Sequence, residues 1–193
     1  MAFDLIVMDE DELVEMVQDA IRKQRPYAGF FHWPERAIAE WGVANAFSEA
    51  AASEEGFPLR ELEARQPGED PPDCEGIDTQ GRRIAIEVTE LVDGDAIARA
   101  RRTGDNVWST WDTSRISAGL DHLLTEKDSK RLQGGPYEQY LVLIHTDEPA
   151  LTVDQIEAAV FGHSFPKLHQ VQRAYILLSY DPHRSGYPYV KLL

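Results

Sequence analysis

Two acidic side chains, Asp73 and Glu87, have the type and spacing needed to hold a divalent metal ion. Glu87 lies inside the strand-like run 83–91, and residues 78–81 provide a turn that brings this run back toward Asp73. Three apolar side chains form one face of the run: Ile84, Ile86 and Val88. Glu87 and Thr89 therefore share the opposite face. Two neighbouring carboxylates on a buried strand are costly unless a cation compensates them, so we predict a metal site. The alternative is a hairpin with an exposed acidic face.

The sequence Pro72-Asp73, followed by a turn and then Glu87-Val88-Thr89, resembles the Pro-Asp and Asp/Glu-x-Lys motif of the PD-(D/E)xK nuclease superfamily. The resemblance implies a restriction-endonuclease-like fold, Asp73 and Glu87 as metal ligands, Mg²⁺ or Mn²⁺ as the cofactor, and DNA or RNA as the substrate. Thr89 stands where the family has its catalytic lysine. The candidate catalytic residues are Asp73, Glu87, Thr89 and Lys127.

Two further residues complete the site that this resemblance implies. A glutamate from the first core helix often joins the metal ligands in that superfamily, and the lysine sometimes comes from a neighbouring element. Glu40 lies on the inward side of a helix expected from about Pro34, although it could equally be a rim carboxylate. Lys127 projects from the centre of the apolar stripe of a helix expected over about 112–131. It could replace the missing lysine, or its stem could carry the ammonium out into water.

Basic residues that could contact phosphate follow the predicted strand. The polar stretch after Leu91 reads as a loop or short helix over the site, or as a mobile surface connection. Four candidate substrate-binding residues are Arg99, Arg101, Arg102 and Lys130. No histidine shows metal-ligand spacing, and His145 simply ends the apolar strand expected at 140–144.

The expected fold class is α/β, with one domain over 1–193. An N-terminal helix over 9–25 would serve packing or dimerisation, so a homodimer is one expectation. The core, at about 34–145, reads as helix, three strands, helix and strand. This is the α-β-β-β-α-β order of the resembled superfamily, with a mixed central sheet flanked by helices. A further helix and strands follow over 152–192.

Composition limits the classes of function. The chain has 193 residues and 42% hydrophobic content, which suits one globular domain, and no apolar run reaches membrane-spanning length. Its single cysteine, Cys74, and the absence of a signal-peptide pattern indicate the cytoplasm. The net charge of −15 argues against tight nonspecific binding to nucleic acid.

Three functions remain open at this point. The leading one is a metal-dependent nuclease. The second is a catalytically inactive nuclease-like protein that binds a protein partner, with its acidic surface imitating nucleic acid, since residues 1–75 carry 18 acidic and 6 basic side chains. The third is a phosphoesterase or nucleotide-processing enzyme that uses the same metal pair.

Overall fold

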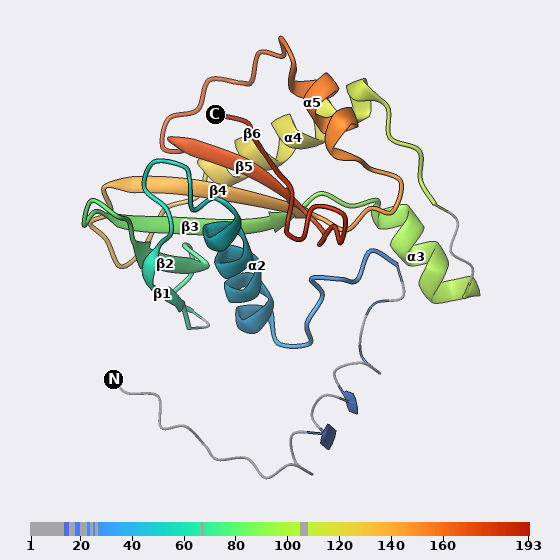
Figure 1. The fold of residues 1–193 in the computed structure, drawn as a ribbon, viewed down its shortest axis with the longest axis horizontal. Helices are drawn as coiled ribbons and strands as arrows, with labels where there is room; N and C mark the ends of the chain where they lie inside the picture. Colours follow the sequence, from blue (N-terminus) through green and yellow to red (C-terminus); the bar gives the residue numbers. More distant parts are fainter. Residues whose placement is uncertain are drawn as a thin grey trace.

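A computed structural model describes residues 14–15, 18–19, 23, 25, 27–66, 68–104 and 108–193. The helix expected over 9–25 lies for the most part outside these residues. In the described chain, the structure is α/β, with a mixed six-stranded open sheet and four helices (Figure 1). No described helix combines the length and the apolar character needed to cross a bilayer.

The six strands lie side by side in the order in which they occur in the chain. They are β1 (Arg60–Ala64), β2 (Cys74–Ile77), β3 (Arg83–Glu90), β4 (Gln139–Thr146), β5 (Arg173–Leu178) and β6 (Tyr189–Lys191). β1, β2 and β3 pair antiparallel, β3, β4 and β5 pair parallel, and β6 returns antiparallel to β5. The predicted mixed sheet is therefore confirmed.

Helices make the connections that the parallel strands require. The four are α2 (Arg36–Ala50), α3 (Gly94–Thr103), α4 (Thr113–Asp128) and α5 (Val153–Val160). α4 lies in the connection from β3 to β4, and α5 in the one from β4 to β5. The loop-or-helix stretch after Leu91 contains α3, which begins at an Asp93 cap and ends at Gly104, a glycine with φ of 72°.

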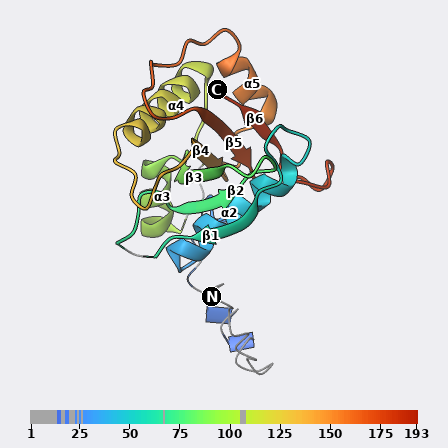
Figure 2. The ribbon, with the colours of Figure 1, turned by 90° about the vertical axis from the view of Figure 1, so that its left-hand side faces the viewer.

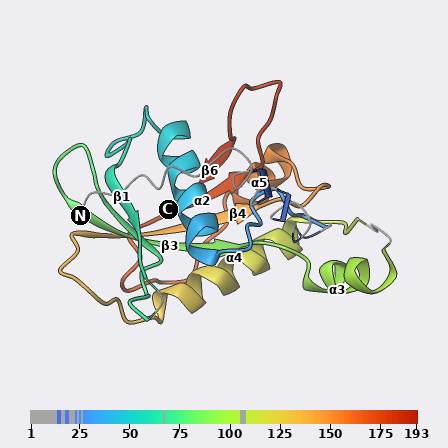
Figure 3. The ribbon, with the colours of Figure 1, turned by 90° about the horizontal axis from the view of Figure 1, so that it is seen from below.

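The sheet is covered on both faces (Figure 2). α4 and α5 pack on one face against alternate strand residues such as Val142 and Ile144, whereas α2 packs on the other against Leu141 and Leu143. β4 thus needs apolar side chains on both sides, and this explains the continuous apolar run of its sequence. Figure 3 views the α2 face and shows α3 at one end of the molecule.

The first strand begins later than its sequence predicts. The sequence pattern predicts a strand from Phe57 to Glu63, whereas β1 spans Arg60–Ala64. Pro58 has no N–H for a strand ladder, and the N–H of Leu59 donates instead to Ser48 Oγ at 2.7 Å. The ring of Phe57 packs into the core under α2. This segment therefore anchors the chain to a helix before it joins the sheet.

An aromatic cluster fixes α2 to the sheet. The ring of Phe47, 1% exposed, lies 4.7 Å from the ring centroid of Tyr175 and 5.1 Å from that of Phe57. Phe47→Ala should lower the free energy of unfolding by about 3–5 kcal/mol, because it opens a cavity in this cluster. Phe161→Ala, at a side chain that is 90% exposed, is the matched control and should change it by less than about 0.5 kcal/mol. Urea denaturation of both variants measures the difference, and equal losses would contradict the packing described.

Candidate active site

The outer half of β3 lacks one neighbouring strand. β2 pairs only with Arg83–Ile86, so Glu87–Glu90 has a backbone partner on the β4 side alone. Asp73, which immediately precedes β2, fills the first vacant position: its Oδ2 accepts a hydrogen bond from the Val88 N–H at 2.8 Å. Asp73 is 2% exposed. The end of β2 therefore opens an edge in the sheet and places a buried carboxylate at that edge.

Glu87 is a carboxylate that is wholly buried in the sheet. Its Oε1 accepts hydrogen bonds from Lys127 Nζ at 3.0 Å and from Lys130 Nζ at 2.8 Å. Its Oε2 is also buried and has no hydrogen-bond partner in the described chain. An unpaired buried carboxylate oxygen is costly, so this atom is the least satisfied polar group of the site.

Helical periodicity explains why a lysine reaches Glu87. Leu120, Leu124 and Lys127 follow one another at spacings of four and three residues, so the stripe that buries the leucines also directs Lys127 onto the sheet. Lys127 is 6% exposed. Its ammonium therefore lies in the protein interior and does not extend into water. Lys130, one turn further on, is partly exposed and also contacts Glu87 rather than standing free for substrate.

Glu40 and Asp73 share one cation. Arg36 Nε donates to Glu40 Oε1 at 2.6 Å, and Arg36 Nη2 donates to Asp73 Oδ1 at 2.8 Å. Even so, burial, with the charge of Asp73 adding to it, raises the pKa of Glu40 to about 7. Burial and then the charge of Glu87 also raise the pKa of Asp73. The positive charge around these two carboxyls is insufficient to offset their desolvation and mutual repulsion.

The donor set fits a hard divalent cation. Asp73 interacts electrostatically with both Glu87 and Glu40, although the ligand atoms of the three do not all lie within 4.8 Å of one another. Hard divalent cations prefer carboxylate oxygens of this kind. The unpartnered Oε2 of Glu87 and the raised pKa values of Glu40 and Asp73 both indicate missing positive charge. Arg36 occupies the side of Asp73 that faces Glu40, so an ion shared by these two would displace its guanidinium.

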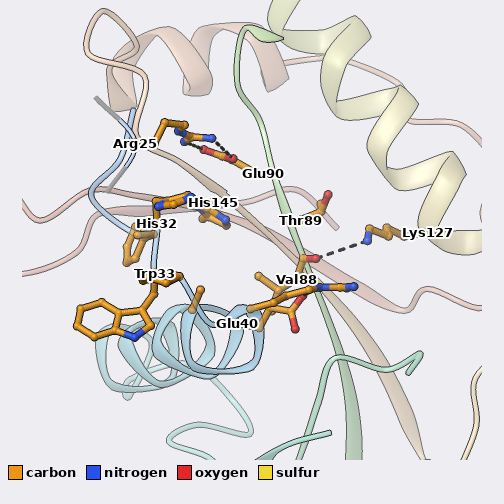
Figure 4. A pocket seen from close by; sticks show the side chains of 13 residues that line it. Arg25, His32, Trp33, Glu40, Val88, Thr89, Glu90, Lys127 and His145 are labelled. Atoms are coloured by element: carbon orange, nitrogen blue, oxygen red, sulfur yellow. Dashed lines mark hydrogen bonds and ion pairs between the residues drawn. The ribbon is translucent and has the colours of Figure 1, made fainter. Parts of the chain in front are cut away.

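A pocket of about 480 Å³ opens beside these groups (Figure 4). Glu40, Thr89 and Lys127 line it, together with Arg36. Asp73 and Glu87 are buried and are not among its lining residues. The predicted Glu40, Thr89 and Lys127 therefore face a space that can admit a ligand, whereas Asp73 and Glu87 contact the lining residues Arg36 and Lys127.

The three arginines predicted to bind substrate lie elsewhere. Arg99, Arg101 and Arg102 are exposed residues of α3, and none of them lines the pocket. α3 packs through Ala96 and Ala100 against the chain near Tyr27 and Ala28.

A second group of ligand-type side chains lies at the same pocket and was missed from the sequence. Glu90 and His145 are register partners on β3 and β4, and Asp147 follows β4. One ligand atom from each lies within 4.8 Å of the other two. Among the described residues this is the group that meets that distance, whereas Glu40, Asp73 and Glu87 do not. Burial lowers the pKa of His145, although Glu90 and Asp147 oppose the shift. Only the strand register brings these residues together.

Comparisons with protein-family models, curated proteins and solved structures found no match to this chain. The assignment of the site therefore depends on its own geometry and chemistry.

The raised pKa of Glu40 predicts a pH-dependent stability. The folded protein keeps a proton on Glu40 up to about pH 7, whereas the unfolded chain releases it near the ordinary value of 4.5. The stability that Glu40 contributes is therefore lost as pH rises between these values, by about 1–3 kcal/mol. Glu40→Gln should remove this loss, as measured by urea denaturation from pH 4.5 to 8 in EDTA.

The exposed Glu49, on the same helix, supplies the control variant Glu49→Gln for the loss of a carboxylate. Parallel stability curves for the wild type and Glu40→Gln across the window would contradict the assignment of this proton to Glu40.

Proposed function

We propose that this protein is a divalent-metal-dependent nuclease that hydrolyses phosphodiester bonds of DNA or RNA at the pocket beside β3. The observation that carries the proposal is the buried, unpartnered Oε2 of Glu87, a carboxylate that a buried lysine contacts and that interacts electrostatically with Asp73 and Glu40. Mg²⁺ or Mn²⁺ is the cofactor that this oxygen donor set favours.

The resemblance to the PD-(D/E)xK superfamily agrees with this arrangement. Asp73 immediately precedes β2 and Glu87 lies on the neighbouring strand β3, as in the motif of that family, and Glu40 comes from the helix that precedes the strands. The element order from α2 to β4 follows the family's order once the inserted α3 is set aside. Lys127 reaches the site from α4 and supplies the cation that Thr89 cannot.

Each side chain has a role that its position permits. A bound divalent ion would neutralise charge on the scissile phosphate and make a nearby water more acidic. Lys127, held by Glu87, can donate to the attacking water or to a phosphate oxygen that gains charge. Thr89 can orient a water in the pocket but cannot neutralise charge. Arg36, once released by Asp73 and Glu40, is positioned to pair with phosphate.

A second candidate function is an inactive nuclease-like protein that binds a protein partner. It is favoured by the fact that Arg36, Lys127 and Lys130 pair with the three carboxylates, and by the net charge of −15. A cluster neutralised in this way would need no metal. Calorimetric titration with Mg²⁺ separates the two functions, because only the nuclease requires binding that Asp73→Ala abolishes.

Glu87→Gln should abolish metal-dependent cleavage, with a fall of at least about 10²-fold, because the neutral amide can neither ligate the ion nor hold both lysines. The measurement is a panel of double-stranded DNA, single-stranded DNA and RNA with Mg²⁺ or Mn²⁺ and with EDTA. Glu126→Gln, at an exposed carboxylate beside Lys127 in sequence, is the matched control and should keep full activity. Wild-type rates in Glu87→Gln would refute the site.

Lys127→Met should lower turnover by about 10²-fold while Mg²⁺ binding remains, because the lysine acts on water and phosphate and not as a ligand. Lys130→Met should have the smaller effect, since this side chain is 32% exposed against 7% for Lys127. Single-turnover cleavage and calorimetry measure the two properties separately. The role of Lys127 would be excluded if its variant cleaved nucleic acid at the wild-type rate.

A further inference from the structure

Glu90, which forms a group with His145 and Asp147, lies on the opposite face of β3 from Glu87. Ala85 packs in the core under α4 and α5, and Glu87 follows it on that face, whereas Val88 and then Glu90 face the α2 side. Glu90 pairs in register with His145, and Asp147 is two residues further along the chain. All three stand at the carboxyl ends of the parallel strands β3 and β4, where open α/β sheets commonly bind ligands.

His145 has a buried ring nitrogen that the described chain does not satisfy. Nδ1 of His145 has no hydrogen-bond partner, and the ring packs edge-on against Phe31 at 5.3 Å between centroids. A buried polar atom without a partner is rare, and metal coordination is one way to satisfy an imidazole nitrogen. This observation is independent of the carboxylates.

Asp147 is held in place by groups that leave it able to bind an ion. Its Oδ2 accepts from the Phe31 N–H at 2.7 Å, and its Oδ1 accepts from Ser179 Oγ at 2.6 Å. A carboxylate oxygen has a second lone pair, so these hydrogen bonds orient Asp147 without exhausting it. Such outer hydrogen bonds are typical of metal ligands.

Arg25 is the cation that pairs with Glu90 in the group of Glu90, His145 and Asp147. Its guanidinium pairs with both carboxylate oxygens of Glu90, at 2.9 Å between Nη1 and Oε2. Arg25, Glu90 and His145 also line the pocket, so an ion can reach the group from solvent. A cation that took Glu90 as a ligand would replace Arg25 there.

We propose that Glu90, His145 and Asp147 form a second cation site, which is distinct from the Asp73–Glu87 carboxylates and selects borderline divalent metals such as Co²⁺ or Zn²⁺ over Mg²⁺. The selectivity follows from the ligands: one imidazole nitrogen with two carboxylates suits these ions, whereas Mg²⁺ prefers oxygen alone. The site does not depend on the proposed nuclease activity.

Titration of the full chain with Co²⁺, after removal of metals by a chelator, tests the site. Visible absorption reports the ligands of Co²⁺, and calorimetry gives affinity and stoichiometry. His145→Asn should remove the visible bands or weaken this binding by at least about tenfold. Asp73→Asn and His122→Asn should retain the bands, the latter as a control at an exposed histidine. Mg²⁺ in molar excess over the protein should not displace the Co²⁺.

Three results would overturn the proposal: no Co²⁺ binding by the wild type, unchanged binding by His145→Asn, or loss of all Co²⁺ binding in Asp73→Asn. Circular dichroism establishes that each variant is folded. Should His145→Asn not fold, Glu90→Gln provides the same test at a side chain that is 23% exposed. Failure of the nuclease proposal is distinguishable, since it appears as the absence of Mg²⁺-dependent cleavage and leaves the Co²⁺ spectrum unchanged.

Discussion

The burial of the Glu87 carboxylate within the sheet is the constraint on which the rest of the site depends. A charged group removed from water loses several kcal/mol of hydration unless paired, so its neighbours must supply positive charge or donors. Lys127 and Lys130 approach one oxygen and leave the other without a partner. An apolar residue in place of Glu87 would not carry this desolvation cost. A buried carboxylate that is only partly hydrogen-bonded therefore indicates a role other than packing.

The topology creates this environment by ending one strand early. Because β2 stops pairing at Ile86, four residues of β3 present a backbone edge, and the sheet cannot close over them. Asp73 covers the first exposed N–H, and α2 places Arg36 and Glu40 along the same edge. The residues of β3 that line the pocket therefore come from both faces of this strand. Glu87 and Glu90, three residues apart, consequently belong to different ligand groups.

Local patterns predict the parts of the site that depend on one element. Strand alternation places Glu87 opposite Ile86 and Val88, and helical spacing places Lys127 on a buried stripe. The parts of the site that depend on how strands pair cannot be predicted from local sequence patterns. His145 reads as an ordinary end of an apolar strand until the parallel register sets it beside Glu90. The position of the α3 arginines away from the pocket similarly depends on how that helix packs, and its sequence does not contain this information.

The net charge of −15 has opposite effects on the two kinds of ligand that the pocket would meet. It attracts divalent cations and raises their local concentration, but it repels a polyanion by the same field. Attraction for phosphate must therefore be local. On the proposed function, Arg36, Lys127 and Lys130 would provide it, although each of them pairs with Asp73 or Glu87. A metal ion that takes over Asp73 and Glu87 would release this positive charge toward the pocket. On the proposed function, ion binding and phosphate binding would be coupled through the same carboxylates, and each ligand would strengthen the binding of the other.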